Sequence, residues 1–103
     1  MQYDEFGFFN QQLAAMLREG IPLEGALKQL CLGMRVSPLR SEFEELQADL
    51  VRGTPLKTAL AHRKLPPLYA RMVEIGVRGN DLPGMLTLLA DYFHRANALS
   101  SSP

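Results

Sequence analysis

The side chains that could do chemistry are two histidines, one cysteine and a group of acidic residues. His62 and His94 could bind a metal, but neither has a cysteine or carboxylate at the i+4 spacing of a helical ligand pair. Asp91 precedes His94 by three residues, which permits a contact on one helix face, yet two ligands do not make a metal centre. We therefore expect surface histidines near helix C-termini, where the helix dipole favours them.

The cysteine, the acids and the glycines each have a structural interpretation. Cys31 lies on an apolar helical stripe, as a small buried residue would, and as the only cysteine it cannot form an internal disulfide. The acids between Glu42 and Asp49 are spread over a helix, not gathered in a calcium-binding loop. The glycine turns follow no strand and lack the lysine of a phosphate-binding loop. The sequence thus predicts no catalytic residue, no cofactor and no metal, and so a protein that is not an enzyme.

Composition favours one soluble domain. The chain has 103 residues, of which 47% are hydrophobic and 21% charged. Its eleven basic and eleven acidic residues cancel, so no overall charge favours nucleic acid. No apolar run approaches the ~20 residues of a membrane-spanning helix, and the N-terminus does not resemble a signal peptide. We expect a single helical domain over residues 1–99 and a disordered tail over residues 100–103.

Three similar short motifs recur along the chain, and each has a leucine three residues after a glycine. We call these motifs the corner phrases. They are Arg18-Glu-Gly-Ile-Pro-Leu23, Arg52-Gly-Thr-Pro-Leu56 and Arg78-Gly-Asn-Asp-Leu82. Glycine tolerates the left-handed conformation that ends a helix, and proline suits the first turn of the next. Each phrase therefore predicts a corner between two helices, with positive φ at Gly53 and at one or both of Gly20 and Gly79. The corner residues are Gly20, Pro22, Leu23, Gly53, Pro55, Leu56, Gly79 and Leu82.

Between these corners the apolar residues recur with the period of a helix. The pattern predicts helices over about 4–19, 22–33, 38–51, 55–63, 67–78 and 82–99. Ser37 and Thr54, each followed by proline, are the expected start signals of the third and fourth helices, and Val51 and Ile75 are expected to face the core. Because the connections are short, neighbouring helices should be antiparallel. The predicted fold is all-α, a six-helix antiparallel bundle built from three helical hairpins.

The corner phrases resemble those of a known family. The segment from Phe9 to Leu27 resembles the opening of the type II secretion system protein F domain, which also occurs in platform proteins of type IV pilus assembly. Val51-Arg-Gly-Thr-Pro-Leu-Lys-Thr-Ala-Leu60 is similar to its second corner, and the stretch from Leu65 to Gly76 to its proline-bounded fifth helix. The resemblance covers residues 6–96, and the six-helix bundle of that family agrees with the periodicity.

The third corner departs from the family pattern. The family usually has glycine-glutamate-x-(serine or threonine)-glycine-x-leucine, whereas this chain has Gly76-Val-Arg-Gly-Asn-Asp-Leu82. Val77 therefore replaces the glutamate and Asn80 the glycine. Asparagine also tolerates left-handed backbone, so the turn can form. Loss of the carboxylate puts in doubt any role of that glutamate in metal binding or at an interface.

What the resemblance implies is a scaffold. Family members lie in the bacterial inner membrane, with cytoplasmic domains between membrane helices, and link the assembly ATPase to the filament being built. The resemblance thus implies a non-enzymatic interaction domain at the cytoplasmic face, tied to the membrane only through segments absent from this chain. The alternatives are a soluble helical adaptor unrelated to secretion and a helix-turn-helix regulator. Residues 67–78, the best candidate recognition helix, carry only two arginines.

Charge is unevenly distributed along the chain. Residues 41–50 carry four acids and no base, whereas residues 52–78 carry six bases against Glu74 alone. The two segments could pair inside the fold, or the basic one could form a docking surface for an acidic partner or anionic lipid. The residues expected in such docking are Arg63, Lys64, Arg71 and Arg78.

A surplus of apolar residues near both ends of the chain suggests a weak homodimer. Phe8 with Tyr3, and Tyr92 with Leu99, are the residues expected to form its apolar contact.

Overall fold

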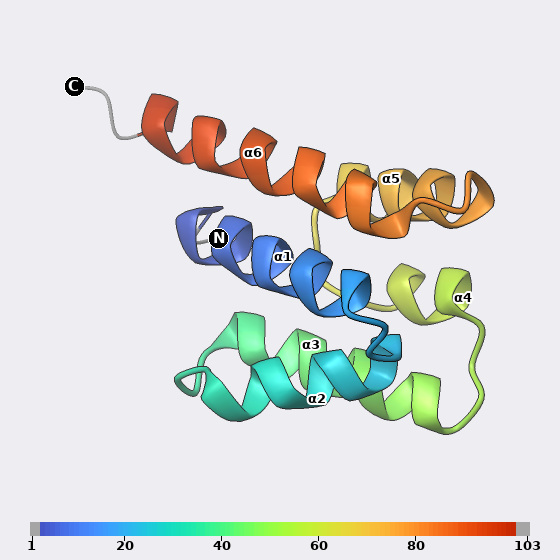
Figure 1. Ribbon diagram of the computed structural model, residues 1–103. Helices are drawn as coiled ribbons and strands as arrows, with labels where there is room; N and C mark the ends of the chain where they lie inside the picture. Colours follow the sequence, from blue (N-terminus) through green and yellow to red (C-terminus); the bar gives the residue numbers. More distant parts are fainter. Residues whose placement is uncertain (1–2, 101–103) are drawn as a thin grey trace.

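A computed structural model describes residues 3–100, with side chains up to residue 98 (Figure 1). Over this range it contains six α-helices and no strand. The helices are α1 Tyr3–Arg18, α2 Leu23–Gly33, α3 Pro38–Val51, α4 Leu56–Ala61, α5 Pro67–Arg78 and α6 Leu82–Ser100. The all-helical expectation is confirmed. Ser100, expected in the tail, is the last residue of α6, and residues 101–103 lie outside the described residues.

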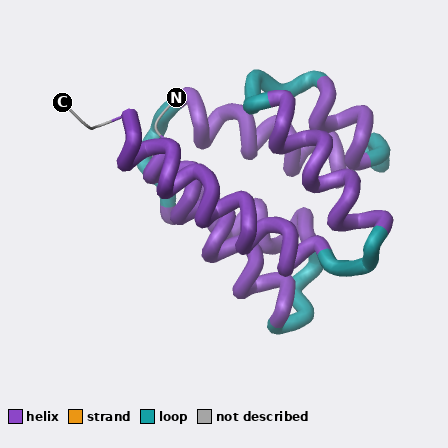
Figure 2. Tube along the Cα trace, turned by 90° about the horizontal axis from the view of Figure 1, so that it is seen from above, coloured by secondary structure: helices purple, strands orange, loops and turns teal. Residues whose placement is uncertain are grey.

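The most extensive packing joins the first helix to the last. The expected arrangement of three hairpins, each made of helices adjacent in sequence, is therefore not confirmed. α1 and α6 lie side by side along most of their length (Figure 1). Arg18, at the end of α1, hydrogen-bonds Thr87 near the start of α6, whereas Asp4 in the first turn of α1 contacts His94. These two contacts show that α1 and α6 run in opposite directions. α2 packs on α3 and α5 on α6, and short loops at the helix ends make the connections (Figure 2).

All three corners close with the same pair of backbone hydrogen bonds. In each, one N–H bonds the carbonyl oxygen three residues earlier, and the next N–H bonds the one five residues earlier. The residue donating the first of these bonds is left-handed: Gly20 at φ +91°, Gly53 at +93° and Asn80 at +53°. The expectation of positive φ at Gly20 and Gly53 is confirmed. Gly79 has φ −82°, so the third corner places its left-handed residue one position later, at the asparagine that tolerates it.

The three corner leucines are half-buried and pack against the core at one cavity. Leu23, Leu56 and Leu82 begin α2, α4 and α6, and all three line the same small cavity of about 20 Å³. The cavity wall also includes Leu27, Phe43, Tyr69 and Leu86 of the core. The repeated phrase therefore does two things at each corner: its left-handed residue ends one helix, and its leucine starts the next helix against a shared centre.

Several local expectations need correction. Ser37 caps α3 by accepting a hydrogen bond from the Arg40 backbone N–H, as expected, but Pro55 is the N-cap residue of α4 and makes no side-chain cap bond. Thr54 therefore plays no capping role, and α4 ends at Ala61 instead of Arg63. Pro22 likewise precedes α2. Val51 and Ile75, expected inside, are 64% and 52% exposed, because each lies at the margin of its helix's apolar face.

A buried polar pair, which the apolar periodicity does not reveal, connects α1 to α5. The Asn10 side chain is fully buried, and its amide nitrogen donates to the Phe6 carbonyl oxygen at 2.9 Å. Its oxygen accepts from the Tyr69 hydroxyl at 2.5 Å. Because both partners are buried and satisfied, the pair fixes α5 at one position on α1.

Candidate functional site

The histidines do not form a metal centre with the described residues around them. Among residues 3–98, no cluster of three histidine, cysteine or carboxylate side chains is placed to hold a metal ion. Asp91, whose spacing permits a contact with His94, pairs instead with Arg95 at 2.8 Å. His94 turns instead to α1, where its Nδ1 lies 2.9 Å from Asp4 Oδ1 and its ring lies close over Gly7. Its role here is packing between α1 and α6.

Cys31 behaves as the sequence predicts. Its side chain is buried in the core. Burial raises the pKa of the thiol, as does the carboxylate of Glu44 to a smaller extent, whereas Arg40 acts in the opposite direction. A buried cysteine with a raised pKa carries little thiolate at neutral pH, which makes it a poor nucleophile.

The acidic and basic segments pair inside the fold at Arg63. Its guanidinium bonds Glu45 and lies 3.8 Å from Glu42, both on α3, and its side chain is only 13% exposed. The backbone N–H of Lys64 also donates to Glu42, at 2.9 Å. These contacts attach the α4–α5 connection to α3. Arg63 therefore serves the internal pairing, and the docking expectation does not fit its position.

Arg71 and Arg78 are placed differently. Both are exposed on α5, together with Ile75, and we call Arg71, Ile75 and Arg78 the α5 stripe. Arg78 pairs with Glu74 at 2.5 Å, and Glu74 also lies 3.6 Å from Lys57. Within the described chain Arg71 has no ion-pair partner, so one cation of the stripe is free to meet another molecule.

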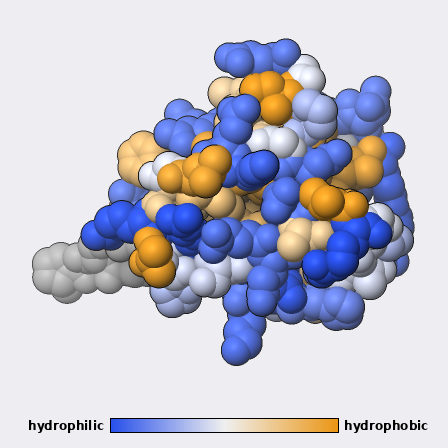
Figure 3. All heavy atoms as spheres, turned by 90° about the horizontal axis from the view of Figure 1, so that it is seen from below, coloured by the Kyte–Doolittle hydropathy of each residue, from blue (hydrophilic) through white to orange (hydrophobic). Residues whose placement is uncertain are grey.

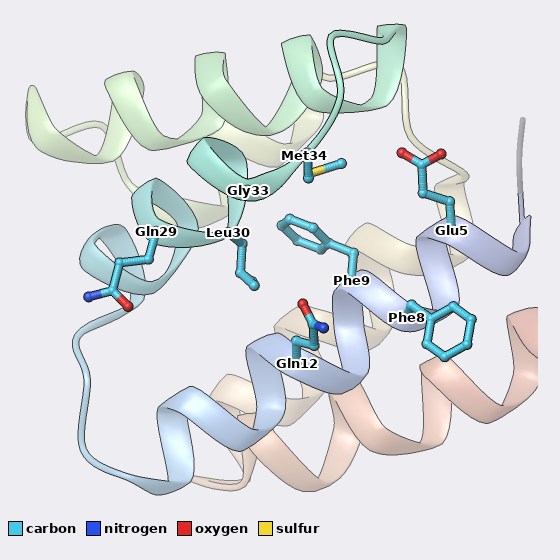
Figure 4. Close-up of a pocket in the computed structure, with 8 residues that line it drawn as sticks. All are labelled: Glu5, Phe8, Phe9, Gln12, Gln29, Leu30, Gly33 and Met34. Carbon is cyan, nitrogen blue, oxygen red and sulfur yellow. The ribbon is translucent and has the colours of Figure 1, made fainter.

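An apolar groove runs between α1 and α2. It encloses about 320 Å³, and its lining residues are Glu5, Phe8, Phe9, Gln12, Gln29, Leu30, Gly33 and Met34 (Figure 4). Phe9 and Leu30 project into it from opposite helices, and Glu5 lies at the end nearer the α2–α3 loop (Figure 4). A second hollow shares Glu5, Phe8 and Met34 and continues the groove to Arg35. We call this feature the α1–α2 groove.

The expected dimer residues are only partly available. Phe8 is 54% exposed beside the groove and its ring makes a T-shaped contact with the His94 ring, and Tyr92 is 52% exposed on α6. Tyr3, however, stacks on Phe93 at a centroid distance of 5.6 Å and belongs to the α1–α6 contact. The side chain of Leu99 lies outside the described residues. Seen from below, apolar residues form separate patches on a mostly polar surface (Figure 3).

Comparison with known proteins identifies the family. Residues 9–101 match the family described as type II secretion system (T2SS), protein F. The chain belongs to the type II secretion system protein F family. The match covers all three corners, α2 in full and α1 from Phe9 onward. It does not favour the alternatives of an adaptor unrelated to secretion or a helix-turn-helix regulator.

Two curated relatives of this protein F domain agree with the match. A type II secretion system protein F from Xanthomonas campestris pv. campestris is 34% identical over 93 residues, which cover 88% of this chain and 23% of the relative. The type IV pilus assembly protein TapC from Aeromonas hydrophila is 27% identical over 99 residues, which cover 94% of this chain and 24% of TapC. The chain thus spans about a quarter of the length of these relatives. None of the helices within residues 3–100 is long and apolar enough to cross a bilayer.

Proposed function

We propose that this protein F domain is a non-enzymatic interaction domain of an inner-membrane platform protein in type II secretion or type IV pilus assembly. In this role it lies at the cytoplasmic face and links the assembly ATPase to membrane components. The observation that carries the proposal is the family match over residues 9–101. The names of the relatives, which refer to secretion and to pilus assembly, support it.

The α5 stripe is the proposed docking surface for an acidic partner, together with the exposed Lys64 on the connection that precedes α5. Arg71 and Arg78 are seven residues apart, and two helical turns bring them to one face. Arg71 is exposed, and neither it nor the Lys64 side chain has an ion-pair partner within the described chain. Arg63 supports the surface indirectly, because its bond to Glu45 fixes the loop that precedes α5.

Binding to the cognate assembly ATPase tests the proposal. The purified domain and the ATPase should associate, and the affinity should fall as salt shortens the screening length of ~8–10 Å. Reversal of both cations, Arg71→Glu with Arg78→Glu, should abolish the association. Lys28→Glu, a matched reversal of an exposed cation on α2, should leave it intact. No association of the wild-type domain, or equal binding by the double variant, would contradict the proposed docking.

A further inference from the structure

We propose that the α1–α2 groove of one copy receives the α5 stripe of a second copy, giving a head-to-tail contact between identical domains. The inference rests on the proposed docking role of α5 and names an acidic partner for it. Groove and stripe lie on different helices, so every copy carries both halves of the contact.

Charge complementarity supports this occupant. Glu5 lines both hollows of the groove and, within the described chain, has no ion-pair partner. Arg71 is the corresponding unpaired cation on α5. A guanidinium placed against a carboxylate at an apolar site gains more than an exposed pair does, because less water screens it.

The spacing of the two surfaces also matches. On α1, Glu5 and Gln12 are seven residues apart with Phe9 between them; on α5, Arg71 and Arg78 are seven apart with Ile75 between. Each span is roughly 10.5 Å along its helix. When the two helices run parallel, Arg71 meets Glu5, Ile75 enters the groove, and Arg78 reaches the side-chain amide oxygen of Gln12. An antiparallel arrangement of the two helices is less favourable, because Glu5 would then meet Arg78, whose charge Glu74 already neutralises.

The apolar part of the contact explains two exposed residues. Ile75 is 52% exposed and Phe8 is 54% exposed, although both are large and apolar. In the proposed contact Ile75 packs beside Phe8 and Met34 at the groove, which removes the apolar surface of both copies from water. One helix in one groove is a small interface, so the association should be weak and should depend strongly on concentration.

Complementary charge reversal gives the test. Sedimentation velocity over a concentration series should show the wild-type domain associating. Glu5→Arg and Arg71→Glu should each raise the dissociation constant of self-association by about ten-fold or more, because each puts like charges together at the contact. An equimolar mixture of the two variants should associate again, since each reversed residue then finds its opposite on the other variant. Lys28→Glu, outside groove and stripe, should associate like the wild type.

The remaining outcomes also test the proposed contact between copies. A wild-type domain that stays monomeric at high concentration overturns the inference, as does a mixture that associates no better than its components. Ile75→Glu, at an exposed position, should abolish association while the circular dichroism spectrum stays unchanged, which covers the case in which Glu5→Arg fails to fold. If self-association is absent but ATPase binding still requires Arg71, the proposed function stands and this inference fails.

Discussion

The Tyr69 hydroxyl donates a 2.5 Å hydrogen bond to Asn10 Oδ1, and both side chains are almost completely removed from solvent. The bond joins residues 59 positions apart in sequence. It is the polar contact that fixes how α5 lies on α1, and α5 carries the exposed arginines. The correct placement of the α5 stripe thus depends on a buried hydrogen bond that Tyr69 makes from the opposite side of α5.

Tyr69→Phe should lower the free energy of unfolding by about 1–3 kcal/mol, because it leaves the buried Asn10 oxygen without a donor. Urea denaturation measures the loss. Asn10→Leu in the Tyr69→Phe background removes the unsatisfied group, so the double variant should lose less than the two single changes added together. Strict additivity would show that the hydrogen bond is not coupled.

Gly53→Val should destabilise the domain by on the order of 1–2 kcal/mol, since φ at Gly53 is +93° and a β-branched residue is strongly disfavoured there. Gly33→Ala is the matched control. A Cβ at Gly33 would meet nothing within 4 Å and its backbone is not left-handed, so alanine should be neutral or stabilising. Thermal melts compare the two; equal midpoints would refute the corner assignment.

Gly76→Ala tests the close approach of α5 to α6. A Cβ at Gly76 would lie 2.7 Å from the Met85 Cβ and 3.3 Å from the Leu82 Cα, atoms that cannot move without shifting α6. We expect a loss of about 1–3 kcal/mol in the free energy of unfolding. Chemical denaturation provides the measurement, and a variant as stable as the wild type would mean that the helices can separate at little cost.

Arg63 and Arg71 should respond oppositely to charge reversal. Arg63→Glu sets a new carboxylate beside Glu42 and Glu45 at a largely buried position, and should cost about 1–3 kcal/mol. Arg71→Glu, at an exposed position, should change stability by less than about 0.5 kcal/mol. Denaturant midpoints for both variants separate internal pairing from surface charge, and strong destabilisation by Arg71→Glu would assign that arginine to the fold.

Alkaline pH should destabilise the domain. Burial raises the pKa values of Tyr69 and Cys31 above their ordinary 10.0 and 9.0, so the unfolded chain loses these protons at lower pH than the folded one. The stability they contribute is therefore complete below about pH 9 and falls as pH rises further. Thermal midpoints measured against pH report the decline. Tyr69→Phe should remove the portion of this decline in thermal midpoint that occurs above about pH 10. An identical pH profile for that variant would contradict the assignment of the decline to Tyr69.

The helices and corners could be predicted from sequence because they follow from local chemistry. Gly53 and Gly20 end helices by a backbone property that any reader of the sequence can recognise, and Ser37 caps α3 by a short-range hydrogen bond. The third corner shows the limit of that reasoning. A glycine was available at Gly79, yet the chain places the left-handed conformation at Asn80, because the hydrogen-bond pattern of the corner counts from the end of α5.

The candidate surfaces depended on long-range contacts and were harder to predict. Charge counts showed an excess of cations after α3, but not that Arg63 pairs internally while Arg71 stays exposed. The α1–α2 groove needs the angle between two helices, which periodicity does not contain. Asn10 was missed from the sequence, although a polar residue on the buried face of α1 needs a partner; the sequence does not indicate that this partner is Tyr69.

The packing of α1 on α6 means that the fold can be completed only late in synthesis on the ribosome. A ribosome releases α1 before any other helix described here, but the surface that covers Phe6 and Gly7 is completed only when Phe93 and His94 emerge. Until then the nascent chain exposes an aromatic strip that is open to chaperones or to wrong partners. Folding rate should accordingly be set by closure of this longest loop, and circular permutation that joins α6 directly to α1 should speed it.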